Sequence, residues 1–165
     1  MAVLQGVEKI VSGGQTGVDR AALDVGLELG MACGGWCPRG RRAEDGRIPE
    51  AYPLRETPAS FYPQRTEWNV RDSDGTLVLA PGKPRGGTAL TLRLARRLSR
   101  PSLTVDLDLP ADPEAVCAWI SENGIRVLNV AGPRESENAG VHDRARRFLL
   151  GVLAPGLVSE RAWSP

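Results

Sequence analysis

The residues best suited to chemistry near the N-terminus are glycines and polar side chains that follow an apolar run. Ser12 to Asp19 reads Ser-Gly-Gly-Gln-Thr-Gly-Val-Asp and leads directly into a helical pattern. Glycines there let backbone amides approach an anion, and the start of a helix adds unpaired N–H donors. The segment therefore predicts a phosphate-binding loop, with a plain tight turn as the alternative. The candidate ligand-binding residues are Gly13, Gly14, Gln15, Thr16, Gly17 and Asp19.

Two features of this loop narrow the interpretation. It lacks the lysine of the Walker motif and the spacing of the GxGxxG motif, so ATP hydrolysis and ordinary NAD binding are disfavoured. Asp19 stands at the start of the helical pattern, where a carboxylate also serves as a helix cap or as a first-turn acid. Contact with a ligand and a purely structural role are both left open for Asp19.

Two more loops of the same kind follow later apolar runs. Pro84 to Thr88 reads Pro-Arg-Gly-Gly-Thr, and Asn129 to Ser136 reads Asn-Val-Ala-Gly-Pro-Arg-Glu-Ser. Loops that follow parallel strands offer their donors on the same side of the sheet. Thr88 either caps its own helix or reaches a phosphate oxygen, and Arg134 either pairs with an anion or is a surface arginine. These loops add the candidate ligand-binding residues Gly86, Gly87, Thr88, Asn129, Gly132 and Arg134.

The longest stretch without periodicity, residues 37–64, is rich in proline, and it mixes arginines with acids at its start. Long loops without secondary structure tend to be functional or disordered. We expect a lid over the ligand here, with solvated salt bridges as the alternative. Arg41 is then a candidate ligand-binding residue. Glu44 and Asp45 are candidates for acid/base catalysis, if the protein is an enzyme, or for holding ligand hydroxyls.

The elements that must position these loops alternate between short apolar runs and amphipathic segments, as in βαβ units. We therefore expect an α/β fold: a Rossmann-like, doubly wound, mainly parallel five-stranded sheet with helices on both faces, and a ligand beyond the carboxyl ends of the strands. The expected strands are Glu8–Ser12, Met31–Trp36, Gly75–Ala80, Ser102–Leu107 and Arg126–Ala131, and the expected helices are Val18–Leu29, Arg65–Asp72, Thr88–Leu98, Pro113–Asn123 and Val141–Leu153.

The length and charge of the chain bound its class. With 165 residues, the chain is expected to form a single Rossmann-like nucleotide- or cofactor-binding domain over residues 1–155, with a loose C-terminal tail over 156–165. A net charge of +1 provides no field that would draw it to nucleic acid or anionic lipid. No stretch approaches the roughly 20 apolar residues of a membrane span, and the N-terminus does not resemble a secretion signal. We expect a soluble, cytoplasmic protein.

Metal binding is disfavoured by the number and spacing of candidate ligands. The cysteines are Cys33, Cys37 and Cys117, and the single histidine, His142, lies far along the chain from the first two. A zinc site needs about four ligands that can converge. No dedicated metal site is therefore predicted, and the cysteines are expected to be thiols.

Several motifs together resemble the bacterial family of putative molybdenum carriers, over roughly residues 8–153. That family looks like part of a Rossmann-like superfamily that includes the molybdenum cofactor carrier proteins, the phosphoribohydrolases of the LOG type and DNA-processing protein A. The resemblance implies a cleft for a nucleotide or phosphate. The motifs that carry it are Gly13–Leu23, Gly34–Pro38, Ala43–Gly46, Gly86–Thr88 and Asn129–Arg134.

One departure bears on enzymatic activity. The phosphoribohydrolases carry a PGGxGTxxE motif whose glutamate takes part in cleaving the N-glycosidic bond, and the matching position here is Thr91. Hydrolysis by that route would need Glu44 or Asp45 to supply the carboxylate instead.

Three functions are consistent with these residues. The first is a carrier or binding protein for molybdenum cofactor, or for a related phosphate-bearing nucleotide or cofactor. The second is a nucleotide N-glycosidase of the phosphoribohydrolase kind, and the third is a nucleotide sensor. We also expect a homo-oligomer, as the resemblance implies, with Trp119 offering an apolar surface to a second subunit.

Overall fold

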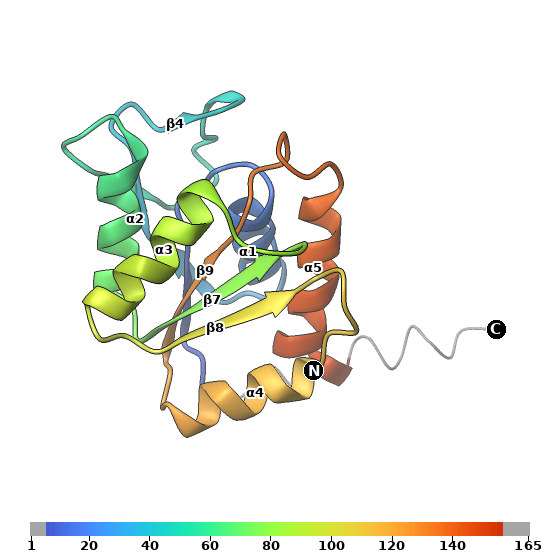
Figure 1. The fold of residues 1–165 in the computed structure, drawn as a ribbon. Helices are drawn as coiled ribbons and strands as arrows, with labels where there is room; N and C mark the ends of the chain where they lie inside the picture. Colours follow the sequence, from blue (N-terminus) through green and yellow to red (C-terminus); the bar gives the residue numbers. More distant parts are fainter. Residues whose placement is uncertain (1–5, 157–165) are drawn as a thin grey trace.

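A central parallel sheet organises the chain in the computed structural model, which describes residues 6–156 (Figure 1). The sheet has five strands in the order β2-β1-β9-β7-β8, and every neighbouring pair is parallel. This arrangement confirms the predicted mainly parallel, five-stranded α/β fold of the Rossmann-like kind. The strands are β1 (Lys9–Val11), β2 (Ala32–Gly34), β7 (Gly75–Ala80), β8 (Ser102–Asp106) and β9 (Val127–Ala131).

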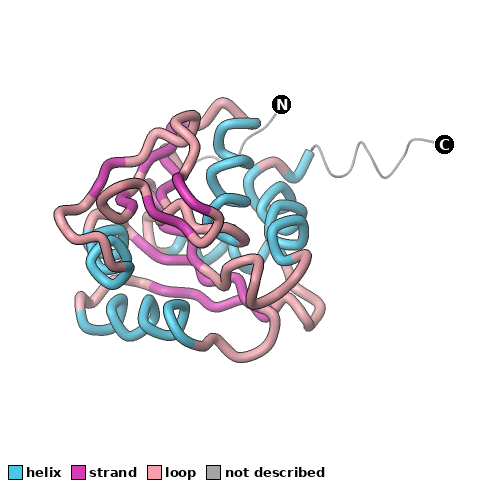
Figure 2. Tube along the Cα trace, turned by 90° about the horizontal axis from the view of Figure 1, so that it is seen from above, coloured by secondary structure: helices cyan, strands magenta, loops and turns pink. Residues whose placement is uncertain are grey.

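Helices cover both faces of this sheet (Figure 2). Contacts between helices group α1 with α5 and α5 with α4, and they group α2 with α3. The molecule is thus a three-layer sandwich. The helices are α1 (Val18–Glu28), α2 (Tyr62–Arg71), α3 (Gly86–Arg97), α4 (Pro113–Glu122) and α5 (Val141–Leu153).

Burial explains why the interior strands are the ones that sequence patterns identify best. All six residues of β7, Gly-Thr-Leu-Val-Leu-Ala, are buried, as expected of a parallel strand with helices on both faces. The edge strand β8 alternates between exposed and partly buried residues. Ile10, Leu77 and Leu128 from three neighbouring strands lie in one apolar core with the inner faces of α1 and α5.

The direction of the connections reverses in the middle of the sheet. From β1 the chain passes through α1 to β2 on one side, and from β7 it passes through α3 to β8 on the other. β9 lies between β1 and β7. In open α/β sheets, ligands bind beyond the carboxyl ends of the strands at such a reversal point. The loops after β1, β7 and β9 therefore meet where a ligand is expected.

The predicted irregular loop has more local structure than its composition indicates. It contains two small ribbons, β3 (Trp36–Cys37) paired with β6 (Arg55–Glu56), and β4 (Arg42–Ala43) paired with β5 (Gly46–Arg47). α2 begins at Tyr62 rather than at Arg65, because Pro63 is accommodated in the first turn, where its missing N–H has no partner to lose.

Two further expectations concern the ends of the chain and the membrane. The predicted tail lies outside the described residues from position 157 onward. Within residues 6–156, none of the helices combines the length and apolar character that a membrane span requires.

Candidate functional site

A cleft of about 450 Å³ opens at the carboxyl edge of the sheet, between the first turns of α1, α2 and α3 and the loop after β9. Two layers of the sandwich contribute to it, as expected at the reversal point of the sheet. Its lining residues are Gln15, Asp19, Tyr62, Pro63, Arg65, Thr66, Gly86, Gly87, Thr88, Leu90, Thr91, Arg93, Ala131, Gly132, Pro133, Arg134 and Glu137.

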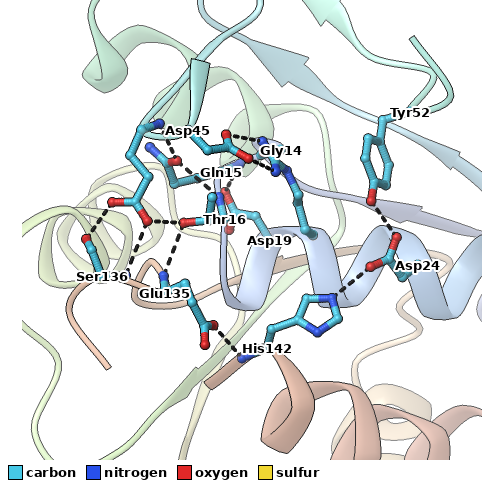
Figure 3. Close-up of polar contacts among 12 residues, drawn as sticks. Gly14, Gln15, Thr16, Asp19, Asp24, Asp45, Tyr52, Glu135, Ser136 and His142 are labelled. Carbon is cyan, nitrogen blue, oxygen red and sulfur yellow. Dashed lines mark hydrogen bonds and ion pairs between the residues drawn. The ribbon is translucent and has the colours of Figure 1, made fainter. Parts of the chain in front are cut away.

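The first glycine loop offers fewer free donors than the sequence indicates, because groups of the protein itself occupy them. The amide of Gln15 donates to Oδ2 of Asp19 at 3.2 Å, and the amide of Val18 donates to the carbonyl of Pro133 at 3.3 Å. The amide of Thr16 donates to Oε1 of Gln15 at 3.0 Å. Figure 3 shows these side chains folded back onto the loop. A carboxylate and a carbonyl thus stand where an anion was expected.

Close packing against other parts of the protein explains the glycines of this loop. A Cβ on Gly17 would lie 2.4 Å from the carbonyl oxygen of Pro133, and a Cβ on Gly14 would lie 2.5 Å from the side chain of Leu54. Both residues also have a positive φ, of 79° and 76°. A Cβ on Gly13 would overlap the guanidinium of Arg65. Each glycine therefore makes room for another part of the protein.

A buried ion pair forms part of the cleft wall. Nη1 of Arg65 lies 3.0 Å from Oδ2 of Asp19, whose side chain is 5% exposed. Burial raises the pKa of Asp19 above its ordinary value, and the charge of Arg65 and the hydrogen bond from Gln15 offset this only in part. Asp19 is thus the first-turn acid of α1, one of the two roles left open for it.

Two buried donors in this wall lack partners. Nε2 of Gln15 and Nε of Arg65 are the buried side-chain nitrogens without a hydrogen bond within residues 6–156. Both residues line the cleft. A buried donor left unpaired costs about 1–3 kcal/mol, so a ligand or water that pairs with either one gains that free energy.

The start of α3 is the open helix N-terminus of the cleft. No side chain caps α3, and a Cβ on Gly86 or Gly87 would meet no atom within 4 Å. The amides of these two glycines belong to the first helical turn, where they have no carbonyl four residues earlier in the helix, and they have no other partner among the described residues. Thr88 is buried, and within residues 6–156 its hydroxyl has no hydrogen bond; because it lies inside the helix, the capping alternative is excluded and contact with a phosphate remains open.

Arginines surround Tyr62 at the mouth of the cleft. The guanidiniums of Arg42, Arg65 and Arg134 lie 5.3, 5.5 and 5.5 Å from the centre of its ring. The Arg134 side chain is 34% exposed and also pairs with Glu137 at 3.2 Å. Three guanidiniums therefore lie around Tyr62, two of which are paired with carboxylates of the protein, Arg65 with Asp19 and Arg134 with Glu137.

A second hollow of about 580 Å³ adjoins the cleft and shares Gly86 and Thr88 with it. Lys83 and Arg85 lie on its wall. The start of α3 therefore lines two adjacent hollows.

Comparison with known proteins places this geometry in a family. The model of one family, described as "Circularly permutated YpsA SLOG family", matches residues 10–153 of the chain. The chain belongs to this family. The YpsA SLOG match covers the five-stranded sheet, all five helices and the whole cleft.

A solved structure is similar to this YpsA SLOG protein over nearly its whole length. It is the crystal structure of "Putative molybdenum carrier protein" from Syntrophus aciditrophicus, with 45% sequence identity and a TM-score of 0.88. The alignment covers 90% of this chain and 96% of the other. The resemblance that the motifs indicate is thereby confirmed at the level of fold. No curated protein matches the chain.

The two candidate catalytic acids of this YpsA SLOG chain do not line the cleft. Glu44 accepts hydrogen bonds from the hydroxyl of Thr16 and from the backbone amide and hydroxyl of Ser136. Burial acts to raise the pKa of Glu44, but these hydrogen bonds outweigh it and the net shift is downward. The hydrogen bonds from Arg20 likewise lower the pKa of Asp45. Both side chains attach the long loop to its neighbours.

The long loop covers the first glycine loop rather than the cleft. No residue between 35 and 61 lines the cleft, so the expected lid over that space is absent from its walls. Ile48 and Leu54 instead lie against Gly14. Arg41, a candidate ligand-binding residue, is 5% exposed and organises this loop from inside. Its guanidinium donates to the carbonyls of Ile48, Pro49, Tyr52 and Leu54 at 2.8–3.2 Å.

The remaining candidates divide between the cleft and the core. Asn129 lies within β9 and donates to the hydroxyl of Thr76 at 3.1 Å, outside the walls of the cleft. Gly132 lines the cleft, and a Cβ there would lie 2.2 Å from the carbonyl oxygen of Leu79. Thr16 and Gly17 lie beside the loop after β9, where the amide of Glu135 donates to Thr16.

Sequence reasoning missed the contribution of α2 to the cleft. Tyr62, Arg65 and Thr66 all line it from the first turns of this helix. The predicted helix Arg65–Asp72 already placed a basic residue at the start of a helix. The local sequence contains no signal that this helix start lies opposite the start of α3. Thr91, at the position of the phosphoribohydrolase glutamate, also lines the cleft and donates to the carbonyl of Gly87 at 3.0 Å.

The described residues contain no group of three or more histidine, cysteine, aspartate or glutamate side chains that could hold a metal ion. Trp119 is half-buried and packs on the main core, where it contacts the position of Gly75. Part of its side chain remains exposed, and the expected contact with a second subunit and the homo-oligomer both stay predictions.

Proposed function

We propose that the chain binds a phosphate-bearing small molecule in the cleft, with the phosphate at the start of α3. The observation that carries the proposal is the uncapped N-terminus of α3, which lines the cleft and has open space beside Gly86 and Gly87. Free amides and the helix dipole favour an anion at such a position. The hydroxyl of Thr88 and the guanidinium of Arg134 add further donors around it.

The proposal favours binding or carriage over hydrolysis. The acids expected to catalyse N-glycosidic cleavage, Glu44 and Asp45, are engaged in hydrogen bonds away from the cleft. Thr91 brings no carboxylate to the position used by the phosphoribohydrolases. The acids that do line the cleft are Asp19, which is paired with Arg65, and Glu137, which is paired with Arg134.

We further propose that the ligand belongs to a class that includes nucleotides and the molybdenum cofactor. The similar structure from Syntrophus aciditrophicus is named a putative molybdenum carrier protein. Molybdenum cofactor is a phosphorylated pterin, so it would present a phosphate to α3 and a polar ring to the rest of the cleft. Mass spectrometry under native conditions on the purified protein would identify a ligand of this class directly.

Binding of defined probes tests the proposal. Isothermal titration calorimetry would use inorganic phosphate and guanosine 5′-monophosphate. Thr88→Val keeps the shape of the side chain and removes its hydroxyl, so we expect affinity for both probes to fall about tenfold, the effect of losing one hydrogen bond to a charged group. Thr104→Val, on the exposed side of β8, is the matched control and should bind like the wild type.

Two results would contradict the proposal. One is a wild-type protein that binds neither probe, and the other is a Thr88→Val variant that binds both as tightly as the wild type. Release of free guanine by the wild-type protein in the same samples would instead favour the N-glycosidase alternative.

A further inference from the structure

The orientation of the Gln15 side chain is fixed by its own hydrogen bonds. Its Oε1 accepts from the amide of Thr16 at 3.0 Å and from the amide of Glu44 at 2.9 Å. Because both partners are donors, the bonded atom must be the oxygen, and the other end of the side chain is the NH2 group. The residue is 5% exposed and lines the cleft. A buried amide donor is therefore held in place with no protein acceptor.

Arg65 and Asp19 beside it form a pair without net charge. The second unpaired donor, Nε of Arg65, belongs to a guanidinium that is already neutralised by Asp19. Both hydrogen bonds that the Asp19 carboxylate accepts within residues 6–156 go to Oδ2. Its other oxygen, Oδ1, can therefore accept a hydrogen bond from a ligand. The residues of this wall thus contain two unpaired donors and one acceptor that can take a further hydrogen bond.

A phosphate fits this wall poorly. It would lie beside the buried carboxylate of Asp19. The charge of Arg65 already balances that carboxylate, so the pair offers no net positive charge to the phosphate. Bringing a second anion next to a buried carboxylate carries a large desolvation and repulsion cost. An uncharged group with hydrogen-bond acceptors beside a donor can satisfy the same three atoms without that cost.

We propose that the cleft has two subsites, in which Gln15, Asp19 and Arg65 bind an uncharged polar group while α3 holds the phosphate. This inference rests on the proposed function and adds the chemistry of the ligand's other end. Two sources supply such a group: the hydroxyls of a ribose, or the lactam edge of a ring such as guanine or a pterin. A single ligand reaching both subsites would be oriented by them.

The experiment compares probes that share a phosphate and differ in the uncharged part. Calorimetry would measure affinity for guanosine 5′-monophosphate, ribose 5-phosphate and inorganic phosphate, each expressed relative to inorganic phosphate. If a substitution changes the charge of the cleft and so weakens the binding of every phosphate equally, this ratio does not change. Gln15→Glu keeps an oxygen for Thr16 and Glu44 and exchanges the free donor for an acceptor. Asp19→Asn removes the carboxylate while keeping its size.

We expect wild-type protein to bind guanosine 5′-monophosphate more tightly than inorganic phosphate, and Gln15→Glu to lower this ratio about tenfold. If the ribose is the group recognised, the ratio for ribose 5-phosphate falls as well. If the ring is recognised, only the nucleotide ratio falls. Asp19→Asn should also lower the ratio without tightening the binding of inorganic phosphate.

Matched controls exist for both variants. Gln64→Glu makes the same change at a glutamine that accepts a backbone hydrogen bond outside the cleft, and Glu67→Gln removes an exposed carboxylate of α2. Neither should change any ratio. Circular dichroism would check that the variants fold. If Asp19→Asn does not fold, the test rests on Gln15→Glu alone.

Several outcomes would overturn the inference. Ratios unchanged in folded Gln15→Glu, a wild type that does not prefer the nucleotide, or an Asp19→Asn variant that binds inorganic phosphate more tightly would each do so. The last result would put the phosphate on the Asp19 wall. If Thr88→Val still weakens the binding of inorganic phosphate, the inference fails while the proposed function stands.

Discussion

At the residue scale, positions suited to a ligand and positions filled by the protein itself look alike in the sequence. Gly86 and Gly87 have open space where a side chain would be, whereas Gly17 faces the carbonyl of Pro133. Gly30 has a positive φ and open surroundings, so it isolates backbone strain from steric overlap. These glycines differ in steric overlap and in backbone strain, and substitution by alanine can measure the two effects separately.

We predict that Gly17→Ala destabilises the fold more than Gly30→Ala does. Both changes force a side chain into the left-handed region, at a cost of about 1 kcal/mol. Gly17→Ala adds an overlap with the backbone of the loop after β9, so its total cost should exceed about 2 kcal/mol. Urea unfolding followed by circular dichroism measures both. Equal losses would mean that the loop after β9 moves away freely.

At the element scale, the long loop depends on one buried cation. Arg41 has a positive φ of 53° and donates to four carbonyls of the segment that follows it. Backbone carbonyls without partners are costly when they are buried, so this guanidinium replaces the hydrogen bonds that a regular element would supply. The ribbons β3–β6 and β4–β5 frame the same segment.

We predict that Arg41→Lys loosens this loop. An ammonium cannot reach carbonyls that lie around a planar guanidinium, so two or more hydrogen bonds are lost, at a total cost of about 2–4 kcal/mol. Limited proteolysis should cut between residues 41 and 55 faster than in the wild type. Arg39→Lys, at an exposed position of the same loop, should leave the cleavage rate unchanged. Equal resistance of both variants would rule out this role for Arg41.

The elements were predictable to different degrees, for physical reasons. The apolar run Gly75–Ala80 and the stripe of α5 are local signals, because burial of a strand or of one helix face imposes a period on the sequence itself. The roles of Glu44 and Arg65 depend on partners distant in sequence, such as Asp19 for Arg65. The partners of Arg41 are nearby carbonyls, but they belong to a segment without a periodic pattern. No local pattern separates an arginine that binds carbonyls from one that binds phosphate. The sequence therefore indicated the edge of the sheet where the cleft lies but not which of its glycine loops is open.

At the scale of the whole molecule, three parts meet at one carboxylate. Asp24 of α1 accepts a hydrogen bond from the Tyr52 hydroxyl at 2.6 Å and lies 2.7 Å from Nε2 of His142 in α5 (Figure 3). Burial is the largest cause that raises the pKa of Tyr52 to about 12. Tyr52 is thus a neutral donor at neutral pH. His142 is the titratable member of this group, and Asp143 is its other acidic neighbour.

We predict that stability falls as pH rises through neutrality. Burial acts to lower the pKa of His142, but its contacts with Asp24 and Asp143 outweigh burial and the net shift is upward. A raised folded pKa means that protonation stabilises the fold. This contribution is fully present below the ordinary value of about 6.5 and is lost as pH rises through the folded pKa. Urea midpoints measured across this range would show the decline.

His142→Gln supplies the control for this pH dependence. A glutamine still donates to Asp24 but does not titrate, so the decline just above pH 6.5 should flatten in the variant. A wild-type protein whose urea midpoint rises or stays level across that range would contradict the prediction, as would a variant with the same slope as the wild type.

The attachment of the long loop also governs how fast a ligand comes and goes. Glu44, Asp45 and Tyr52 hold that loop on α1 and on the turn after β9, and the loop contributes no wall to the cleft. Under the proposed function, entry and departure would not require residues 35–61 to move. Residence time would depend only on the contacts made inside, and a bound molecule would stay within reach of an acceptor protein, which could take it directly without waiting for a gate to open.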